Sequence, residues 1–218
     1  MTTLPILWTF RRCPYAMRAR LAIQSSGQQV VLQEILLKDK PAPFLAASPK
    51  GTVPVVQDGS TLIEQSRDVM LWALGRNDPE GWLDMPDEGH ALMDTCDGPF
   101  KSALDHTKYA VRYPDRDEAS ERAKAMVFLN ALNDRLAQSP FLMGAQRTLA
   151  DMAILPFVRQ FANTDRAWFD AQRLSPLTNW LDDFLASDRF RVIMKKYPPW
   201  QHGQDQVLFP QTSDKDIT

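Results

Sequence analysis

Cysteine and histidine are both scarce in this chain. Its 218 residues include two cysteines, at positions 13 and 96, and three histidines. Two cysteines so far apart in the sequence form neither a metal-ligand spacing nor a disulfide framework. The histidines are scattered and show no metal-binding spacing either; they are His90, His106 and His202. We therefore predict a protein that holds no metal, and a structural role for Cys96.

Long apolar runs are also missing. No stretch approaches the roughly 18 residues of a membrane span. The start of the chain, Met1 to Pro5, lacks the charged residues and apolar core of a secretory signal. A net charge of only −2 does not favour nucleic-acid or membrane-surface binding by bulk electrostatics. We therefore expect a cytoplasmic protein without nucleic-acid or membrane partners, in a reducing compartment where a single thiol can be used repeatedly.

Acidic residues are absent before Glu34, and the basic ones gather near Cys13. Cys13 lies between a short apolar run and a segment of helical spacing, so it should occupy a strand-to-helix turn. Unpaired helix N–H groups and the positive end of the helix dipole converge there, and Pro14 suits the first helical position. Such settings lower the pKa of a cysteine from about 8.5 to roughly 3.5–7.5. We predict a reactive thiolate at Cys13. The neighbouring arginines are Arg11, Arg12, Arg18 and Arg20.

These arginines have a second interpretation, the solvated face of a helix, which is how most such runs behave. Helical spacing places Ala16, Ala19 and Ile23 on the inner face. Arg18, Gln24 and Ser25 should then face outward. Arg11 and Arg12 are, by position, the arginines expected nearest a ligand, and the basic excess of this region indicates a small anionic one.

The first part of the chain alternates strand and helix patterns. Because a helix separates the first two strands, they should be parallel. Val53–Pro54 is a candidate for a cis peptide bond, and Asp58-Gly59 predicts a hairpin. The predicted elements are strands over 5–9, 29–36 and 51–56, helices over 13–26 and from Gln65 onward, a short helix within 38–48 and a hairpin strand at 62–63.

The rest of the chain shows helical spacing without a convincing strand. We predict an α/β domain over 1–78, a linker over 79–87 and an all-helical domain over 88–218. Thr148 and Asp151 form a variant of the capping box, and the polar tail beyond Pro198-Pro199 should fray. The predicted helices cover 88–108, 118–138, 149–160 and 175–187.

Several of these motifs, in this order, resemble a known family. Cys13-Pro-Tyr-Ala before an Arg-rich helix, Thr52-Val-Pro-Val and Gln65-Ser66 resemble the thioredoxin-like N-terminal domain of cytosolic glutathione S-transferases. The helical half, with Thr148-Leu-Ala-Asp opening a buried helix, resembles their C-terminal domain. The cysteine-type members, omega-like and related bacterial classes, fit better than the Tyr or Ser classes. The resemblance implies a βαβαββα domain followed by a helical one, glutathione as cosubstrate, and a homodimer.

The resemblance also implies roles for individual residues. Cys13 corresponds to the family's thiol. The backbone of Val53, before Pro54, should pair with the cysteinyl part of glutathione. Gln65 and Ser66 should hold its γ-glutamyl end. The remaining correspondences are Lys40, or alternatively Lys50, for the glycyl carboxylate, and Tyr15 at the border of the ligand.

Three functions remain open from the sequence. Ala16 stands where a dithiol redox protein has its second cysteine, which leaves a monothiol route through a mixed disulfide of Cys13 with glutathione. We rank this thiol transfer or reduction, acting on a small disulfide substrate, first. Conjugation of glutathione to a small electrophile is the second candidate. Non-enzymatic binding of glutathione or another ligand is the third.

Overall fold

The structure, a computed structural model, describes residues 3–211 and divides into two compact units. The first combines the described residues up to Glu80 with those from Ser187 onward, and we call it the sheet unit. The second spans Gly81–Ala186 and is the helical unit. Within residues 3–211, none of the helices combines the length and apolar composition that a membrane crossing needs.

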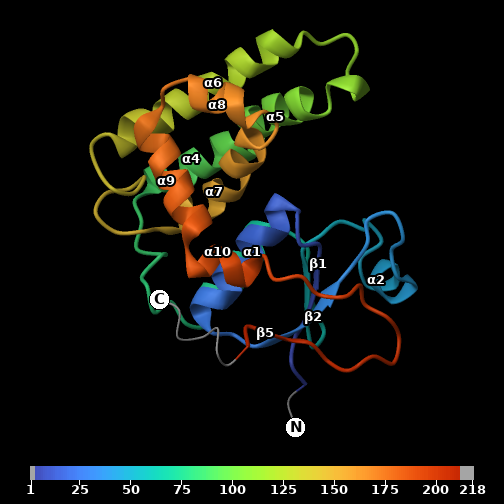
Figure 1. The fold of residues 1–218 in the computed structure, drawn as a ribbon. Helices are drawn as coiled ribbons and strands as arrows, with labels where there is room; N and C mark the ends of the chain where they lie inside the picture. The colour runs from blue at the N-terminus through green and yellow to red at the C-terminus, as the bar shows by residue number, and fades with distance from the viewer. Residues whose placement is uncertain (1–2, 212–218) are drawn as a thin grey trace. The chain divides into compact units, whose positions relative to one another are not determined.

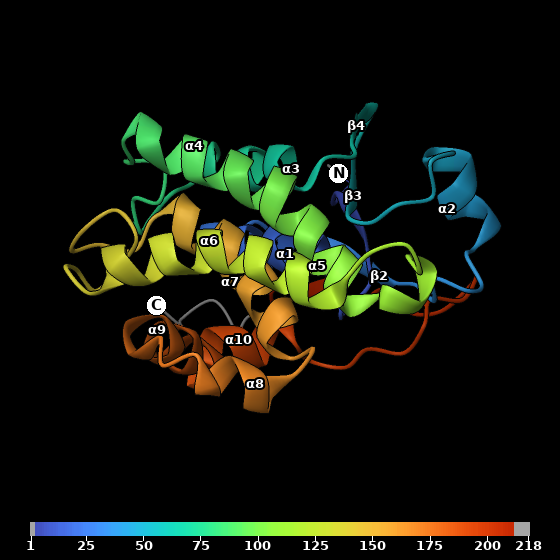
Figure 2. The ribbon, with the colours of Figure 1, turned by 90° about the horizontal axis from the view of Figure 1, so that it is seen from above.

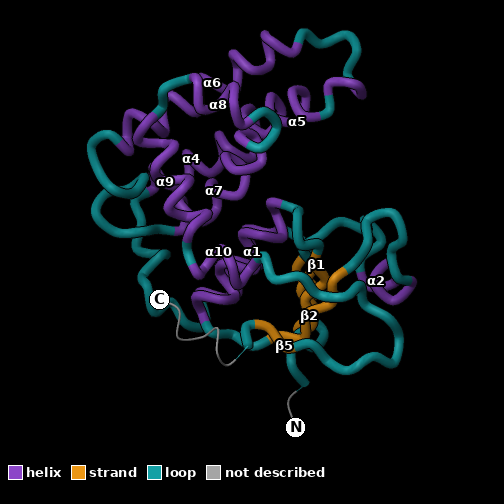
Figure 3. The backbone as a smooth tube through the Cα atoms, in the orientation of Figure 1, coloured by secondary structure: helices purple, strands orange, loops and turns teal. Residues whose placement is uncertain are grey.

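A five-stranded mixed sheet forms the centre of the sheet unit, with the strand order β4-β3-β1-β2-β5. Figure 3 labels β1, β2 and β5 among its orange strands. The first two strands are parallel, as predicted, because a helix connects them. β3 runs antiparallel to β1 and forms a hairpin with β4, whose turn contains Gly59 at φ +59°. The strands are β1 (Ile6–Thr9), β2 (Val30–Glu34), β3 (Val55–Asp58), β4 (Thr61–Ile63) and β5 (Leu208–Phe209).

Two helices pack against each other beside the sheet. A short third helix contributes to a buried cluster around Trp8. The packed pair is α1 (Pro14–Ser26) and α3 (Ser66–Leu74). Side chains alternate along a strand, so Trp8 points away from its neighbours in β1. Trp8 belongs to a buried cluster with Phe44 of α2 (Ala42–Ala47), and their ring centroids are 5.3 Å apart.

The end of the described chain returns to the sheet unit, which corrects two of the predictions. α10 (Asp188–Ile193) contacts α1, and β5 pairs antiparallel with β2. The predicted all-helical domain, 88–218, is therefore wrong for residues 187–211, which belong to the sheet unit. The predicted fraying beyond Pro198-Pro199 is also wrong for the described residues, which continue to Gln211. The free edge of β2 provides backbone partners for a strand too short to show a sequence period. The rest of the predicted fraying tail, 212–218, lies outside the described residues.

The helical unit contains the four predicted helical segments (Figures 1 and 2). A π-helical turn at Cys96–Phe100 interrupts the first one, because Pro99 cannot donate a backbone hydrogen bond. α6 lies alongside α5 (Figure 2), and the ring of its Phe128 lies 4.8 Å from that of Phe100 in the π-helical turn. The helices are α4 (Asp87–Thr95), α5 (Lys101–Lys108), α6 (Glu118–Leu136), α7 (Leu149–Ala162), α8 (Arg166–Ala171) and α9 (Ser175–Ala186), with a 3-10 turn at Ala110–Arg112.

Asp151 is the polar centre of the helical unit. The predicted capping box with Thr148 is confirmed, because the Thr148 N–H donates to Asp151 Oδ2 at 2.9 Å. The other carboxylate oxygen accepts the backbone N–H of Leu142 at 2.9 Å and the indole N–H of Trp180 at 3.2 Å. Burial raises the pKa of Asp151, while these hydrogen bonds oppose the rise. The carboxylate thereby joins the start of α7, the preceding loop and α9.

We expect Asp151→Ala to destabilise the protein by about 3 kcal/mol, since it strands several buried donors whose desolvation costs about 1–3 kcal/mol each. Urea unfolding followed by circular dichroism measures this loss. Asp165→Ala is the matched control, since Asp165 caps α8 at a more exposed site and its loss should cost about 1 kcal/mol. An Asp151 variant no less stable than the Asp165 variant would contradict this role.

Candidate active site

Cys13 occupies the N-cap position of the 13-residue helix α1, at the predicted strand-to-helix turn. Its N–H donates to Phe10 O at 3.1 Å, and its carbonyl accepts the N–H of Met17 at 2.9 Å. The side chain is half-buried against the Trp8 cluster. Its Sγ lies 3.7 Å from the carbonyl oxygen of Val53. The thiol thus sits at the positive end of a helix dipole with part of its surface open.

The Val53–Pro54 peptide bond is cis, as predicted, and it brings the buried Val53 next to the thiol. Gly51, two residues earlier, has φ +60°, a conformation that favours glycine. A Cβ atom at this glycine would lie only 3.2 Å from Lys40 Nζ. The lysine ammonium therefore rests close to the backbone that leads into the cis-proline turn.

Gln65 and Ser66 open helix α3. Gln65 is the exposed N-cap residue, whereas Ser66 is buried and its hydroxyl accepts a hydrogen bond from Arg18 Nε at 3.0 Å. The Arg18 guanidinium also lies over the ring of Tyr15, 5.1 Å from its centroid. This chain of contacts links the first turns of α1 and α3, so Tyr15 and Ser66 are held by the same arginine.

The two candidate lysines have different surroundings. Lys50 forms a 3.4 Å ion pair with Glu64, and Ser48 donates its hydroxyl to the same carboxylate at 2.6 Å. The Ser48 hydroxyl, with a further contribution from Lys50, lowers the pKa of Glu64. Lys50, Glu64 and Gln65 line one open pocket of about 620 Å³. Glu64 directly precedes the Gln65-Ser66 motif, but no sequence pattern marked it as a site residue.

The predicted outward orientation of Arg18 and Gln24 is wrong. Both are buried, with 2% and 3% of their surfaces exposed, and Arg20 is equally buried. Hydropathy patterns place charged residues outside, but a long guanidinium group can be buried where hydroxyl or carbonyl oxygens accept its N–H groups. Arg12 does remain exposed, with its guanidinium 5.6 Å from the ring centroid of Phe10.

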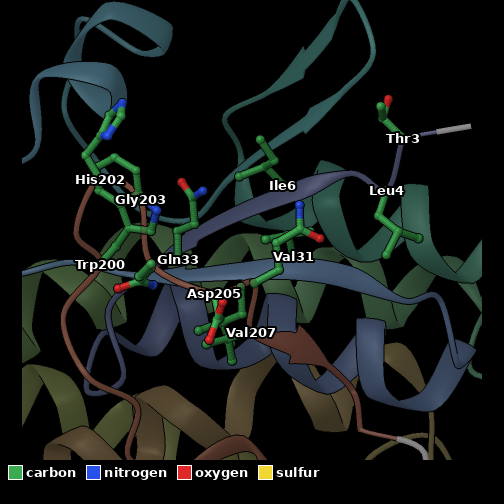
Figure 4. A pocket seen from close by; sticks show the side chains of 13 residues that line it. Thr3, Leu4, Ile6, Val31, Gln33, Trp200, His202, Gly203, Asp205 and Val207 are labelled. Atoms are coloured by element: carbon green, nitrogen blue, oxygen red, sulfur yellow. The ribbon is translucent and has the colours of Figure 1, made fainter.

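A separate pocket of about 550 Å³ lies over β1 and β2, beneath the returning C-terminal segment. Ile6 and Val31 contribute from the strands, and Trp200 and His202 from the segment (Figure 4). Neither Cys13 nor any of the predicted glutathione-binding residues lines it. Within residues 3–211, no group of three or more His, Cys, Asp or Glu side chains is placed to hold a metal ion.

A thioredoxin-like sheet unit with a thiol at the start of α1 and a cis-proline beside it, followed in the chain by a helical unit, defines a class of protein, the glutathione transferase fold. Comparison with family models agrees. Residues 7–81 match the model "Glutathione S-transferase, N-terminal domain", and residues 117–183 match "Glutathione S-transferase, C-terminal domain". This chain belongs to the glutathione S-transferase family.

Curated relatives include plant members of the family. Glutathione S-transferase DHAR2 of Arabidopsis thaliana is 30% identical over 147 residues, which cover 66% of this chain and 64% of the relative. The chloroplastic DHAR3 of the same plant is 28% identical over 149 residues, covering 66% and 53%. The match thus spans less than two thirds of the length of either relative.

Solved structures confirm the predicted fold. Glutathione transferase Omega 3C from Trametes versicolor superposes with a TM-score of 0.76 at 16% identity, over 91% of this chain and 92% of that one. A family member from Pseudomonas fluorescens, with two glutathione molecules bound, gives 0.73 at 14% identity, over 88% and 92%. At these identities the likeness concerns the fold. The cysteine-type, omega-like subclass stays a prediction.

The two cysteines should differ sharply in reactivity. Cys13 is partly exposed, whereas the surface of Cys96 is 0% exposed. We expect iodoacetamide to modify the folded protein once, at Cys13, as measured by intact mass and peptide mapping. Cys13→Ser should remain unmodified until it is unfolded. Labelling of Cys96 at a comparable rate would contradict the assigned burial.

Proposed function

We propose that this protein is a glutathione-dependent thiol transferase in which the Cys13 thiolate forms a mixed disulfide with glutathione. The observation that carries the proposal is the half-exposed Cys13 Sγ at the start of α1, 3.7 Å from the carbonyl of Val53. A thiolate is favoured by the helix N-terminus. Ala16 fills the position of a resolving cysteine, and the chain's other cysteine, Cys96, is buried in the helical unit.

The reaction follows from a single thiolate. The Cys13 sulfur attacks the glutathione sulfur of a glutathionylated substrate, forms a new disulfide with it, and expels the substrate as a thiolate that takes a proton from solvent. A second glutathione, as its thiolate, then attacks the glutathione sulfur of this mixed disulfide. The products are glutathione disulfide and the regenerated Cys13 thiolate. The substrate leaves as a reduced thiol, one reduced glutathione is oxidised, and the other half of the glutathione disulfide comes from the substrate's own glutathionyl group.

The proposed seat for glutathione uses three neighbouring features of the sheet unit. The start of α3, with Gln65 and the Ser66 hydroxyl, offers donors and a favourable dipole for the γ-glutamyl carboxylate. The backbone of Val53 provides hydrogen-bonding groups for the cysteinyl part. Lys40, beside Gly51, supplies a cation for the glycyl carboxylate. Tyr15 would border the ligand.

The two lysines are assigned by their partners. Lys50 is paired with Glu64, which offsets its charge for an anionic ligand. Lys40 is half-buried, and its ammonium lies close to the turn that carries Val53. We therefore favour Lys40 for the glycyl carboxylate. The proposal also places the protein in the cytoplasm and makes it a homodimer. Light scattering of the purified protein would test the homodimer.

Incubation with glutathione disulfide tests the central step. We expect intact-mass analysis to show one added glutathione, mapped to Cys13 and removed by dithiothreitol. Cys13→Ser should show no adduct, while Cys96→Ala should behave like the wild type. A protein that forms no adduct across a range of pH would refute thiol transfer and favour conjugation or plain binding; an electrophile assay with reduced glutathione separates those two.

Substitution of Lys40 should weaken binding of the glycyl carboxylate. We expect Lys40→Ala to raise the concentration of glutathione disulfide needed for half-maximal glutathionylation about tenfold, equivalent to about 1.4 kcal/mol. Lys38→Ala is the matched control, because Lys38 is an exposed lysine in the same loop and should have no effect. A larger effect from Lys50→Ala would transfer the role to Lys50.

A further inference from the structure

We propose that Glu34 is a positioning residue for Cys13, whose buried carboxylate holds the loop before the thiol and balances the charge of Arg20. The inference rests on the proposed role of the Cys13 thiolate. It requires no assumption about how glutathione binds. None of the motifs in the sequence indicated Glu34, which is simply the first acidic residue of the chain.

Glu34 is fixed in place from several sides. It ends β2 and lies opposite Thr9, the last residue of β1, in the parallel register. Only 8% of its surface is exposed. Its carbonyl accepts the N–H of Trp200 at 2.7 Å, so the returning C-terminal segment holds its backbone. The side chain therefore has a defined position beside the point where the chain leaves β1 toward Cys13.

The Glu34 carboxylate is hydrogen-bonded directly to the loop. Glu34 Oε1 accepts the backbone N–H of Arg11 at 2.7 Å, a charge-assisted hydrogen bond. On the other side of the same residue, Arg20 Nη2 donates to the Arg11 carbonyl at 2.6 Å. One buried anion and one buried cation thus hold the N–H and the carbonyl of a single residue, two positions before Cys13.

Arg20 also acts on the hydrogen bond that Cys13 itself makes. Phe10 O accepts the N–H of Cys13 at 3.1 Å and Arg20 Nη1 at 3.4 Å. Arg20 is further anchored by Nε, which donates to Ile193 O at 3.0 Å, and by a contact with the Thr9 hydroxyl. Only two residues separate Phe10 from Cys13, so a shift of the loop would move the thiol.

The charges around this loop come from four elements. α1 contributes Arg20, the loop contributes Arg11 and Cys13, β2 contributes Glu34, and the C-terminal segment contributes Tyr197. Burial raises the pKa of Glu34, while the Arg11 N–H and the two guanidinium groups oppose the rise. Burial lowers the pKa of Arg20 to about 10, with Glu34 as the largest opposing influence and Cys13 the next.

These interactions predict the direction of a charge effect. Arg20 stays cationic at neutral pH, and its attraction is shared between the Glu34 carboxylate and a thiolate at Cys13. Removing the Glu34 charge leaves the cation less compensated, which favours the thiolate. A buried carboxylate that served stability alone would not shift the pH at which Cys13 becomes reactive.

The test measures the rate of Cys13 alkylation by iodoacetamide against pH in the full-length protein. Glu34→Gln keeps an acceptor for Arg11 but loses the charge, and we expect the midpoint of the profile to fall by about 0.5–1 pH unit. A midpoint that stays in place or rises would overturn the charge balance. Glu80→Gln is the control, because Glu80 is a half-buried carboxylate of the same unit. It pairs with Arg189 and accepts a hydrogen bond from Ser25, near the end of α1 opposite to Cys13, so this substitution should leave the midpoint unchanged.

A second variant distinguishes the positioning effect of Glu34 from the effect of its charge. It also provides a test if Glu34→Gln fails to fold. Glu34→Asp keeps the carboxylate but shortens its reach toward the Arg11 N–H. We expect its alkylation midpoint to stay within about 0.2 unit of the wild type, while the limiting rate of glutathionylation at high pH falls about tenfold. An unchanged limiting rate would overturn the positioning role.

The experiments distinguish a failure of the proposed function from a failure of the inference about Glu34. If the wild type forms no adduct with glutathione disulfide, the proposed function falls, but alkylation still reports on Glu34. In that case Glu34→Asp is scored by the limiting rate of alkylation, which should fall; an unchanged rate again overturns positioning. If the adduct forms and the Glu34 variants behave like the wild type, only the inference about Glu34 falls.

Discussion

The hydrogen bonds that hold the backbone between Phe10 and Cys13 are the constraint on which this site depends. The chain must leave β1, reverse, and start α1 with the thiol at its N-terminus. Backbone groups that such a half-buried turn removes from water need partners, because an unpaired one costs about as much as a lost hydrogen bond. Here the partners are the charged side chains of Glu34 and Arg20. Burying a charge is costly unless it is compensated. Here both charged groups make hydrogen bonds to backbone groups, and their opposite charges attract each other.

The C-terminal segment completes this arrangement from the far end of the chain. Ile193 accepts a hydrogen bond from Arg20, although 173 positions separate them, and Trp200 donates to the backbone of Glu34. The indole of Trp200 also packs against Trp8, with ring centroids 5.3 Å apart. Strand β5 then covers the edge of β2, which would otherwise expose unpaired backbone groups. The sheet unit is therefore built from both ends of the sequence.

In the helical unit, too, a buried carboxylate accepts hydrogen bonds from backbone N–H groups. Its buried carboxylate, Asp151, accepts two backbone N–H groups and one indole N–H, and so fixes the start of α7. The motif was visible in the sequence because capping acts between neighbours in the chain. The contribution of Trp180 was not, since that contact spans 29 positions.

Local features of this protein were determined by its sequence alone. The start of α1 at Pro14, the parallel first strands, the cis Val53–Pro54 bond and the capping box at Thr148 each follow from residues close together in the chain. Those residues dictate local backbone geometry. The same patterns placed Cys13 at a strand-to-helix turn, where the structure has it.

The packing of strands and helices determines which charged side chains are buried and which groups they bind. Arg18 faces Ser66 of another helix, Arg20 reaches loop carbonyls, and Glu34 receives a backbone N–H from 23 positions away. Polarity predicts exposure for all three, since water is the default partner of a charge. Their actual partners depend on how the strands and helices pack together. A periodic pattern within one segment does not predict its contacts with other segments.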